Sequence, residues 1–347
     1  MRFVYLASFL VLLFMPLSVV SSHEPAVEAR ARVAEIVESV ERMPQLIRRK
    51  IATPFEDDAR QNVEFFPKRI VDAEGVPVGM MDLDGRRAVH GLLRSVLSQE
   101  GYLLVNEVMA LEEVLRHTGS FSAARLSDNY FVQLFGTPTA DAPWAFKFEG
   151  HHLSLNVTVV GSQLRATPLF LGASPAEVRS GPRAGLRVLG QHEDLARALV
   201  GSLSRAQLEK AHDLGDPRDG IIQRGTQVAA AQNKGIVGAD LSEDQRALLL
   251  ALIETYAHTL AGELSDEAIR RVRESGLKGV RFRWLGSLES GGRYYYRVEG
   301  PTMILEFDML ADCDGCEPNH IHSLWTDPER DFGKDLLREH YEKHHQP

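Results

Sequence analysis

The chain has 347 residues, of which 44% are hydrophobic and 25% are charged, and its formal net charge is −9. This composition is typical of a globular protein with a substantial core, and the length suits one large domain or two small ones. Basic residues do not cluster on the scale that a phosphate backbone requires, so we expect no nucleic-acid partner.

Residues 1–22 have the pattern of a secretory signal peptide. Arg2 precedes an uncharged apolar run from Phe3 to Val20, and the small residues Ser21 and Ser22 follow. We predict cleavage after Ser22, export to the periplasm or the medium, and no stable membrane span in the mature protein. An uncleaved N-terminal anchor is the alternative, because about 20 apolar residues suffice to cross a bilayer.

The remaining chain, residues 23–347, shows no linker and no apparent internal repeat, so we predict a single domain. Helical periodicity or capping patterns are found in residues 26–51, 85–119, 202–211, 240–260, 264–276 and 333–345. Alternating, strand-like runs are found in residues 151–160, 163–172, 280–287, 293–300, 302–310 and 320–326. Strands joined by short turns pair antiparallel. We therefore predict an α+β fold whose mostly antiparallel sheet is covered by helices on one face.

Histidines stand at two of these strands. Side chains alternate across a strand, so His152 should share the polar face of its strand with Ser154, whereas His151 should lie with the apolar row at the core edge. In the last strand His320 and His322 share one face, about 6–7 Å apart along the strand.

The strand at 302–310 places Glu306 and Asp308 on one face. If these strands are neighbours, His152, Glu306, His320 and His322 gather on one sheet surface, and such a set commonly binds zinc, copper or iron. We predict one divalent transition metal of unspecified identity. The alternatives are a metal-free polar pocket in which a histidine acts as acid or base, and a purely structural hydrogen-bond network.

Three further features carry weaker signals. Tyr296 is a candidate hydrogen-bond donor to the site, although core packing is the alternative, and Asp327 either contributes to the site or caps the last helix. Cys313 and Cys316 form a C-x-x-C pair, which is consistent with a local disulfide, a metal role or no role.

The segments "WAFKFEGHHLSLNVTVV", "RYYYRVEGPTMILEFD" and "NHIHSLWTDPERDFGKDLLREHY" resemble an exported bacterial family, the domain of unknown function 3500, over about residues 85–341. The resemblance implies export and these fold boundaries but no activity. Thr326 stands where the family tends to have arginine, so a role that needs a guanidinium beside Asp327 does not carry over from the resemblance.

Two classes of function fit these patterns. The first is an exported metalloenzyme, hydrolytic or oxidative, acting on a small molecule or peptide, in which Glu306 or Asp308 handles protons. The second is a non-catalytic ligand-binding or envelope-associated protein. The nucleophile-elbow, phosphate-loop, dinucleotide and H-E-x-x-H motifs are absent, and the sequence does not indicate an oligomeric state.

Overall fold

The computed structural model describes residues 25–67, 75–118, 125–139, 142–217, 222, 232–311 and 316–344, so the predicted signal peptide lies outside the described residues. The α-helices are α1 (Pro25–Glu41), α2 (Gln45–Ile51), α3 (Leu83–Val96), α4 (Gln99–Thr118), α5 (Gly190–Gly201), α6 (Arg205–Ala211), α7 (Glu243–Ala257), α8 (Gly262–Ser275) and α9 (Lys334–His344). The strands are β1 (Ala52–Thr53), β2 (Val76–Pro77), β3 (Phe131–Phe135), β4 (Trp144–Gly150), β5 (Leu153–Val160), β6 (Gln163–Arg165), β7 (Leu169–Ala173), β8 (His212–Asp213), β9 (Ile236–Val237), β10 (Arg281–Gly286), β11 (Tyr294–Gly300), β12 (Met303–Leu310) and β13 (His320–Thr326).

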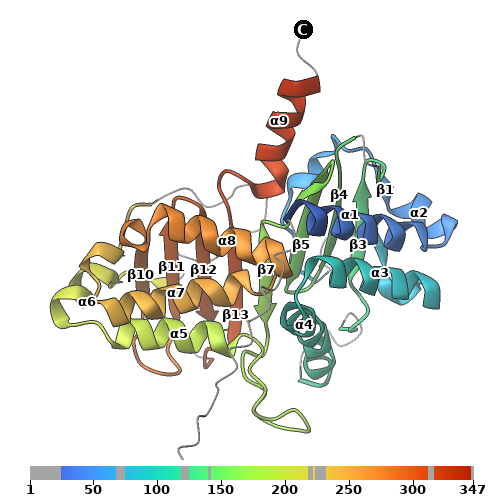
Figure 1. Ribbon diagram of the computed structural model, residues 1–347. Helices are drawn as coiled ribbons and strands as arrows, with labels where there is room; N and C mark the ends of the chain where they lie inside the picture. Colours follow the sequence, from blue (N-terminus) through green and yellow to red (C-terminus); the bar gives the residue numbers. More distant parts are fainter. Residues whose placement is uncertain are drawn as a thin grey trace, which may run out of the picture.

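A single mostly antiparallel sheet crosses the molecule in the order β1-β3-β4-β5-β7-β13-β12-β11-β10-β8. Figure 1 shows α1, α3 and α4 over one half of the sheet and α5, α7 and α8 over the other half, on the same side. The predicted α+β class, with helices on one face of the sheet, is confirmed. Among the described residues, we find no helix that is both long enough and apolar enough to span a membrane.

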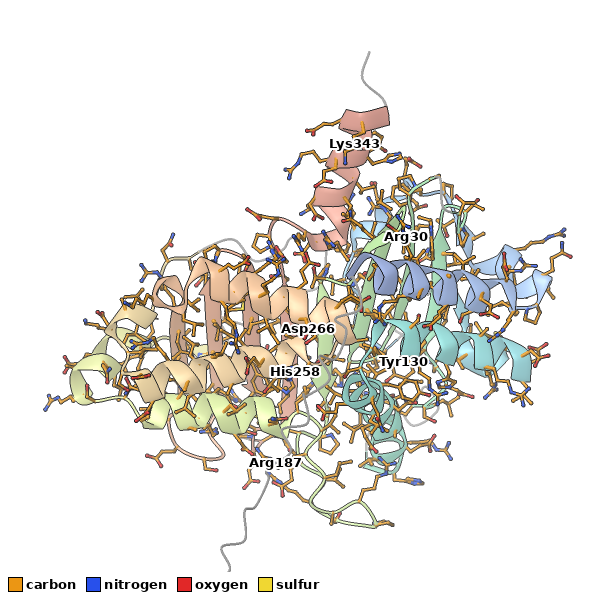
Figure 2. All side chains as sticks on the ribbon, viewed as in Figure 1. Arg30, Tyr130, Arg187, His258, Asp266 and Lys343 are labelled. Carbon is orange, nitrogen blue, oxygen red and sulfur yellow. The ribbon has the colours of Figure 1, made fainter. Side chains whose placement is uncertain are left out.

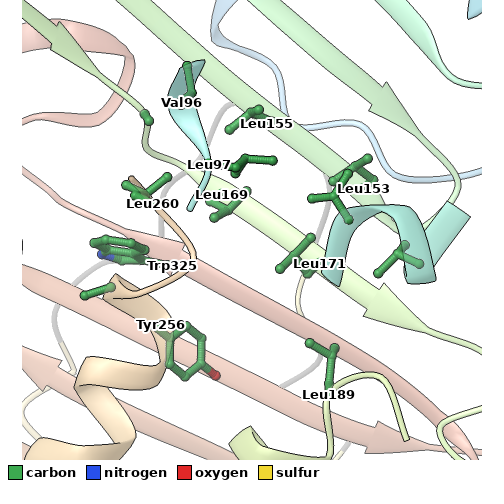
Figure 3. Close-up of a cluster of buried hydrophobic side chains, with 14 of the residues drawn as sticks. Val96, Leu97, Leu153, Leu155, Leu169, Leu171, Leu189, Tyr256, Leu260 and Trp325 are labelled. Carbon is green, nitrogen blue, oxygen red and sulfur yellow. The ribbon is translucent and has the colours of Figure 1, made fainter. Parts of the chain in front are cut away.

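The helix-covered face holds the main hydrophobic core, because alternate strand residues are apolar. Leu153, Leu155, Leu169, Leu171 and Trp325 meet Leu97 and Leu260 from the helical layer where β5, β7 and β13 adjoin (Figure 3). Charged side chains point outward from the helices, as Arg30, Asp266 and Lys343 do in Figure 2. Both predicted capping boxes form, at Ser204–Gln207 and Ser242–Gln245, and fix where α6 and α7 begin.

The structure corrects the expectation of no internal repeat, because the strand order is palindromic. β1, β3, β4 and β5 of the first half correspond to β8, β10, β11 and β12 of the second half. β6 and β7 together correspond to β13, and β7 pairs antiparallel with β13 at the centre. β2 and β9 each add antiparallel to the corresponding strand of their own half. The chain is therefore two equivalent β-sheet units joined along the β7–β13 pair, which we call the seam.

Details of hydrogen bonding repeat as well. The Arg86 guanidinium donates to the carbonyl oxygens of Gly79 and Met81, and the Arg246 guanidinium donates to those of Gly238 and Leu241. Each arginine lies at the start of the helix that follows a short strand, α3 in the first half and α7 in the second. Such matching contacts identify the two halves as copies of one structural unit.

The other face of the sheet is polar but buried. Lys147 of β4 pairs with Glu149 at 3.0 Å and donates to the Ala59 carbonyl. This hydrogen bond holds the segment after β1 against the polar face of the first half of the sheet. Arg297 pairs with Glu299 at 2.9 Å, and Glu299 accepts from the Gln232 N–H, which ties down the segment before β9. These buried charges are tolerable because each has a partner.

The turn before α9 contains a fully buried carboxyl group, that of Asp331. Its Oδ1 accepts the Asp327 N–H at 2.9 Å, and burial raises the pKa of Asp331 to about 7 from 3.8. Because the folded protein then keeps a proton that the unfolded chain has already lost, the free energy of unfolding falls as the pH rises from about 4 to about 7.

We predict that Asp331→Asn removes this component of the pH dependence, since the amide keeps the acceptor oxygen but cannot ionise. Between pH 5 and pH 8 the wild-type protein should lose about 3 kcal/mol of unfolding free energy relative to the variant. Urea unfolding at several pH values measures both curves. A constant difference between the two proteins across this range would contradict the prediction.

Candidate metal centre

His151 and His152 form the two-residue turn between β4 and β5, because Gly150 pairs directly with Leu153. The prediction that the strand starts at His151 is wrong by these two residues. His152 has a φ of 64°, in the left-handed region that tight two-residue hairpin turns use. The turn is held because the His152 N–H donates to Phe65 O at 2.9 Å and the His152 carbonyl accepts from Gly172 N–H at 2.8 Å.

The two histidines of β13 meet this turn across the seam. His322 lies opposite Gly172 of β7, and a Cβ atom on Gly172 would lie only 2.8 Å from Cδ2 of His152. The glycine therefore leaves the space that the His152 ring occupies. The Nε2 atoms of His152 and His320 are 2.7 Å apart, and one ligand nitrogen from each of His152, His320 and His322 lies within 4.8 Å of the others.

This spacing is close to what one metal ion requires. Tetrahedral bonds of about 2.0–2.1 Å place ligand nitrogens about 3.4 Å apart, so shifts of about 1 Å in the rings would complete the geometry. Burial, followed by the neighbouring imidazoles, holds the pKa of His152 well below its usual value. A neutral imidazole at neutral pH is the form that binds metal.

The acidic residue beside the histidines is Asp308. It lies opposite His322 in the β12–β13 register, its Oδ1 accepts the His322 N–H at 3.0 Å, and Nδ1 of His322 lies 3.4 Å from the same oxygen. Its Oδ2 accepts the Ile222 N–H at 3.2 Å. Asp308 thus faces the ring nitrogen of His322 that a metal bound at Nε2 would leave free.

Glu306 is not brought to the histidine cluster. It lies opposite Leu324, and its Oε1 accepts from Tyr295 at 2.5 Å and from Arg297 at 3.1 Å. Burial is the main cause that raises the pKa of Glu306. The expectation that Glu306 is a ligand stays a prediction, and the geometry favours Asp308 as the acidic neighbour.

Glu112 and Arg125 adjoin the site and were not anticipated from the sequence. The ring of His151 stacks on that of His152 with 3.7 Å between centroids, and Nδ1 of His151 contacts both the Glu112 carboxylate and the Arg125 guanidinium. Burial, opposed by Glu112, lowers the pKa of His151. Helical spacing is the signal that could have found Glu112, because it follows the buried Val105 and Val108 by seven and four residues and so lies on the buried face of α4.

The other candidates lie elsewhere. Tyr296 belongs to the helix-covered face, where its hydroxyl contacts that of Tyr256 at 2.8 Å. Asp327 lies at the opposite end of the seam and pairs with Arg271 of α8, which supplies the guanidinium that Thr326 cannot. Cys316 is disulfide-bonded, which is consistent with the local disulfide that is one of the predicted alternatives. Cys313 lies outside the described residues.

The fold and the cluster define an α+β protein with three histidines converging at the seam of a duplicated sheet. A family model described as "Protein of unknown function (DUF3500)" matches residues 26–334. The chain belongs to this family, as the resemblance implied, and the match begins well before residue 85 and ends before residue 341. No curated protein and no solved structure gives a significant match.

We predict that Gly172→Ala disrupts the cluster, because the added methyl group would displace the His152 ring or the Ile321 carbonyl, which lies 2.9 Å from the Cβ position. Affinity for Zn²⁺ should fall about tenfold or more, since ligand rings must be held to within about 0.5 Å. Competition with a chromophoric chelator measures it. Gly201→Ala, which meets nothing within 4 Å, is the control and should bind normally. Equal affinities in the two variants would show that Gly172 does not shape the site.

Proposed function

We propose that this protein binds one divalent transition metal ion through His152, His320 and His322, and that the ion is catalytic. The observation that supports the proposal is the convergence of three imidazoles from two different halves of the chain. Three histidine ligands with a further position for water are typical of catalytic zinc centres, whereas structural zinc sites usually have four protein ligands.

A metal in this position would activate water or dioxygen for a hydrolytic or oxidative reaction on a small molecule or peptide. Around it, the chain supplies an apolar wall, because Phe65 and Phe170 lie 5.3 and 5.5 Å from the His322 ring. We propose that Asp308, in preference to Glu306, is the acidic residue that acts with this centre. Its Oδ1 lies 3.4 Å from Nδ1 of His322, so a small shift of the ring would let Nδ1–H donate a hydrogen bond to this carboxylate, which would orient the ring.

We also propose that the protein is exported, because residues 1–22 have the pattern of a secretory signal peptide. Export would be consistent with a disulfide at Cys316, because thiols are kept reduced in the cytosol. Mass determination of the protein purified from its own cells tests the cleavage after Ser22.

The first test is metal content. We expect about one Zn²⁺, Cu²⁺ or Fe²⁺ per chain by elemental analysis, and a loss of the metal in His320→Ala and His322→Ala. His117→Ala changes an exposed histidine on α4 and is the control. Circular dichroism confirms folding of each variant. A folded wild-type protein that takes up no metal from any of the three salts would overturn the proposal.

The second test separates the two carboxylates. Asp308→Asn should weaken metal binding about 10- to 100-fold, because the amide cannot accept and stabilise the His322 proton in the same way. Glu306→Gln is a matched control on the same strand and face, and it should stay within about twofold of wild type. The opposite order of effects would assign the acidic role to Glu306.

A further inference from the structure

Arg125 is a partly buried arginine beside the histidine cluster. Its side chain is 13% exposed, and its guanidinium lies 3.4 Å from both carboxylate oxygens of Glu112. By comparison, Arg32 makes two bonds of 2.6 and 2.7 Å to Glu263. Charge-assisted bonds are normally about 2.7–2.9 Å long, so the pairing of Arg125 with Glu112 is loose.

Its hydrogen-bonding capacity is only partly used. The contacts of Arg125 to Glu112 and His151 come from one terminal nitrogen, and Nε is buried without a hydrogen-bond partner among the described residues. A guanidinium carries five N–H donors in a planar fork that fits a carboxylate with two parallel bonds. Arg125 therefore has donors to offer to a ligand.

Arg125 is also adjacent to the proposed metal centre. It contacts His151 at 2.5 Å, and the ring of His151 lies 3.7 Å from that of His152.

The charges around the centre favour an anion. The formal charges of Glu112 and Arg125 cancel, and histidine binds a metal ion through its neutral form. A dication beside Asp308 leaves a net charge of about +1 in a site with little water, where an unbalanced charge is costly. A negatively charged ligand would neutralise it.

We propose that the ligand of this centre is a small molecule bearing a carboxylate, and that Arg125 binds that carboxylate while another group of the ligand faces the metal. This inference rests on the proposed metal centre. Arg125 is thus a specificity-determining residue that acts on the ligand and not on the metal.

The experiment uses the full mature chain loaded with Co²⁺, whose bound stoichiometry is measured first by elemental analysis. Succinate and inorganic phosphate are then titrated, and binding is followed by calorimetry and by the Co²⁺ absorption bands. We expect succinate to bind more tightly than phosphate. Arg125→Gln should raise the succinate Kd about tenfold or more without changing the cobalt content, because it removes charge-assisted bonds.

Two further variants sharpen the result. Arg125→Lys keeps the charge but loses the planar fork, so its Kd should lie between those of the wild type and Arg125→Gln. Arg183→Gln is the matched control, because Arg183 also pairs with a glutamate of α4, Glu107, but is 44% exposed. It should bind succinate within about twofold of wild type.

The outcomes distinguish the two proposals. A protein that takes up no cobalt contradicts the metal centre itself. A cobalt-loaded protein that binds no succinate, prefers phosphate, or binds succinate equally well in Arg125→Gln overturns the carboxylate assignment and leaves the metal centre standing.

Discussion

The antiparallel pairing of β7 with β13 is the constraint on which the rest of the structure depends. It joins the two halves of the sheet into one ladder, from Ala173 opposite Ile321 to Leu169 opposite Trp325. It also sets which residues of the first half can meet residues of the second. His152 comes from a turn in one half, and His320 and His322 from a strand in the other, so neither half alone contains the cluster. A slip of one residue in this pairing would turn the β13 histidines to the helix-covered face.

Much of this fold follows from local patterns in the sequence. Period-two alternation placed His320 with His322, and Glu306 with Asp308, on the polar face, because the pleat of a strand leaves little freedom. The capping boxes at Ser204 and Ser242 located two helix starts, since a serine side chain satisfies an N–H group that the helix leaves unpaired.

Alternation does not, however, determine the register in which two strands pair. Asp308 rather than Glu306 faces His322 because of the β12–β13 pairing, which depends on the whole ladder. Glu112 reaches His151 only through the packing of α4 on the sheet.

The duplication is not apparent in the sequence because the two halves share few identical residues. A shift of 150 positions relates Trp144 to Tyr294, Glu149 to Glu299 and Gly150 to Gly300, and the buried cation between them is Lys147 in one half and Arg297 in the other. Glu149 and Gly150 keep their identity in the second half, whereas Trp144/Tyr294 and Lys147/Arg297 keep only aromatic character and positive charge. What the two halves share at these positions is a large aromatic side chain in the core, a partnered charge on the polar face and a glycine before the turn.

The two ends of the seam show how equivalent positions have diverged. Thr158 of β5 pairs with Arg165, and the corresponding Asp308 of β12 pairs with His322, so Arg165 and His322 occupy equivalent sites. Arg165 pairs with Asp335 of α9 at 2.8 Å and, with Arg271 and Arg330, ties the C-terminal helix and α8 to its end of the seam. The turn equivalent to His151–His152 is Pro301–Thr302, which has no imidazole. One end of the duplicated sheet is therefore tied by these ion pairs, whereas the other end collects the imidazoles of His152, His320 and His322 beside the buried carboxylate of Asp308. The difference confines the candidate centre to one end of the molecule.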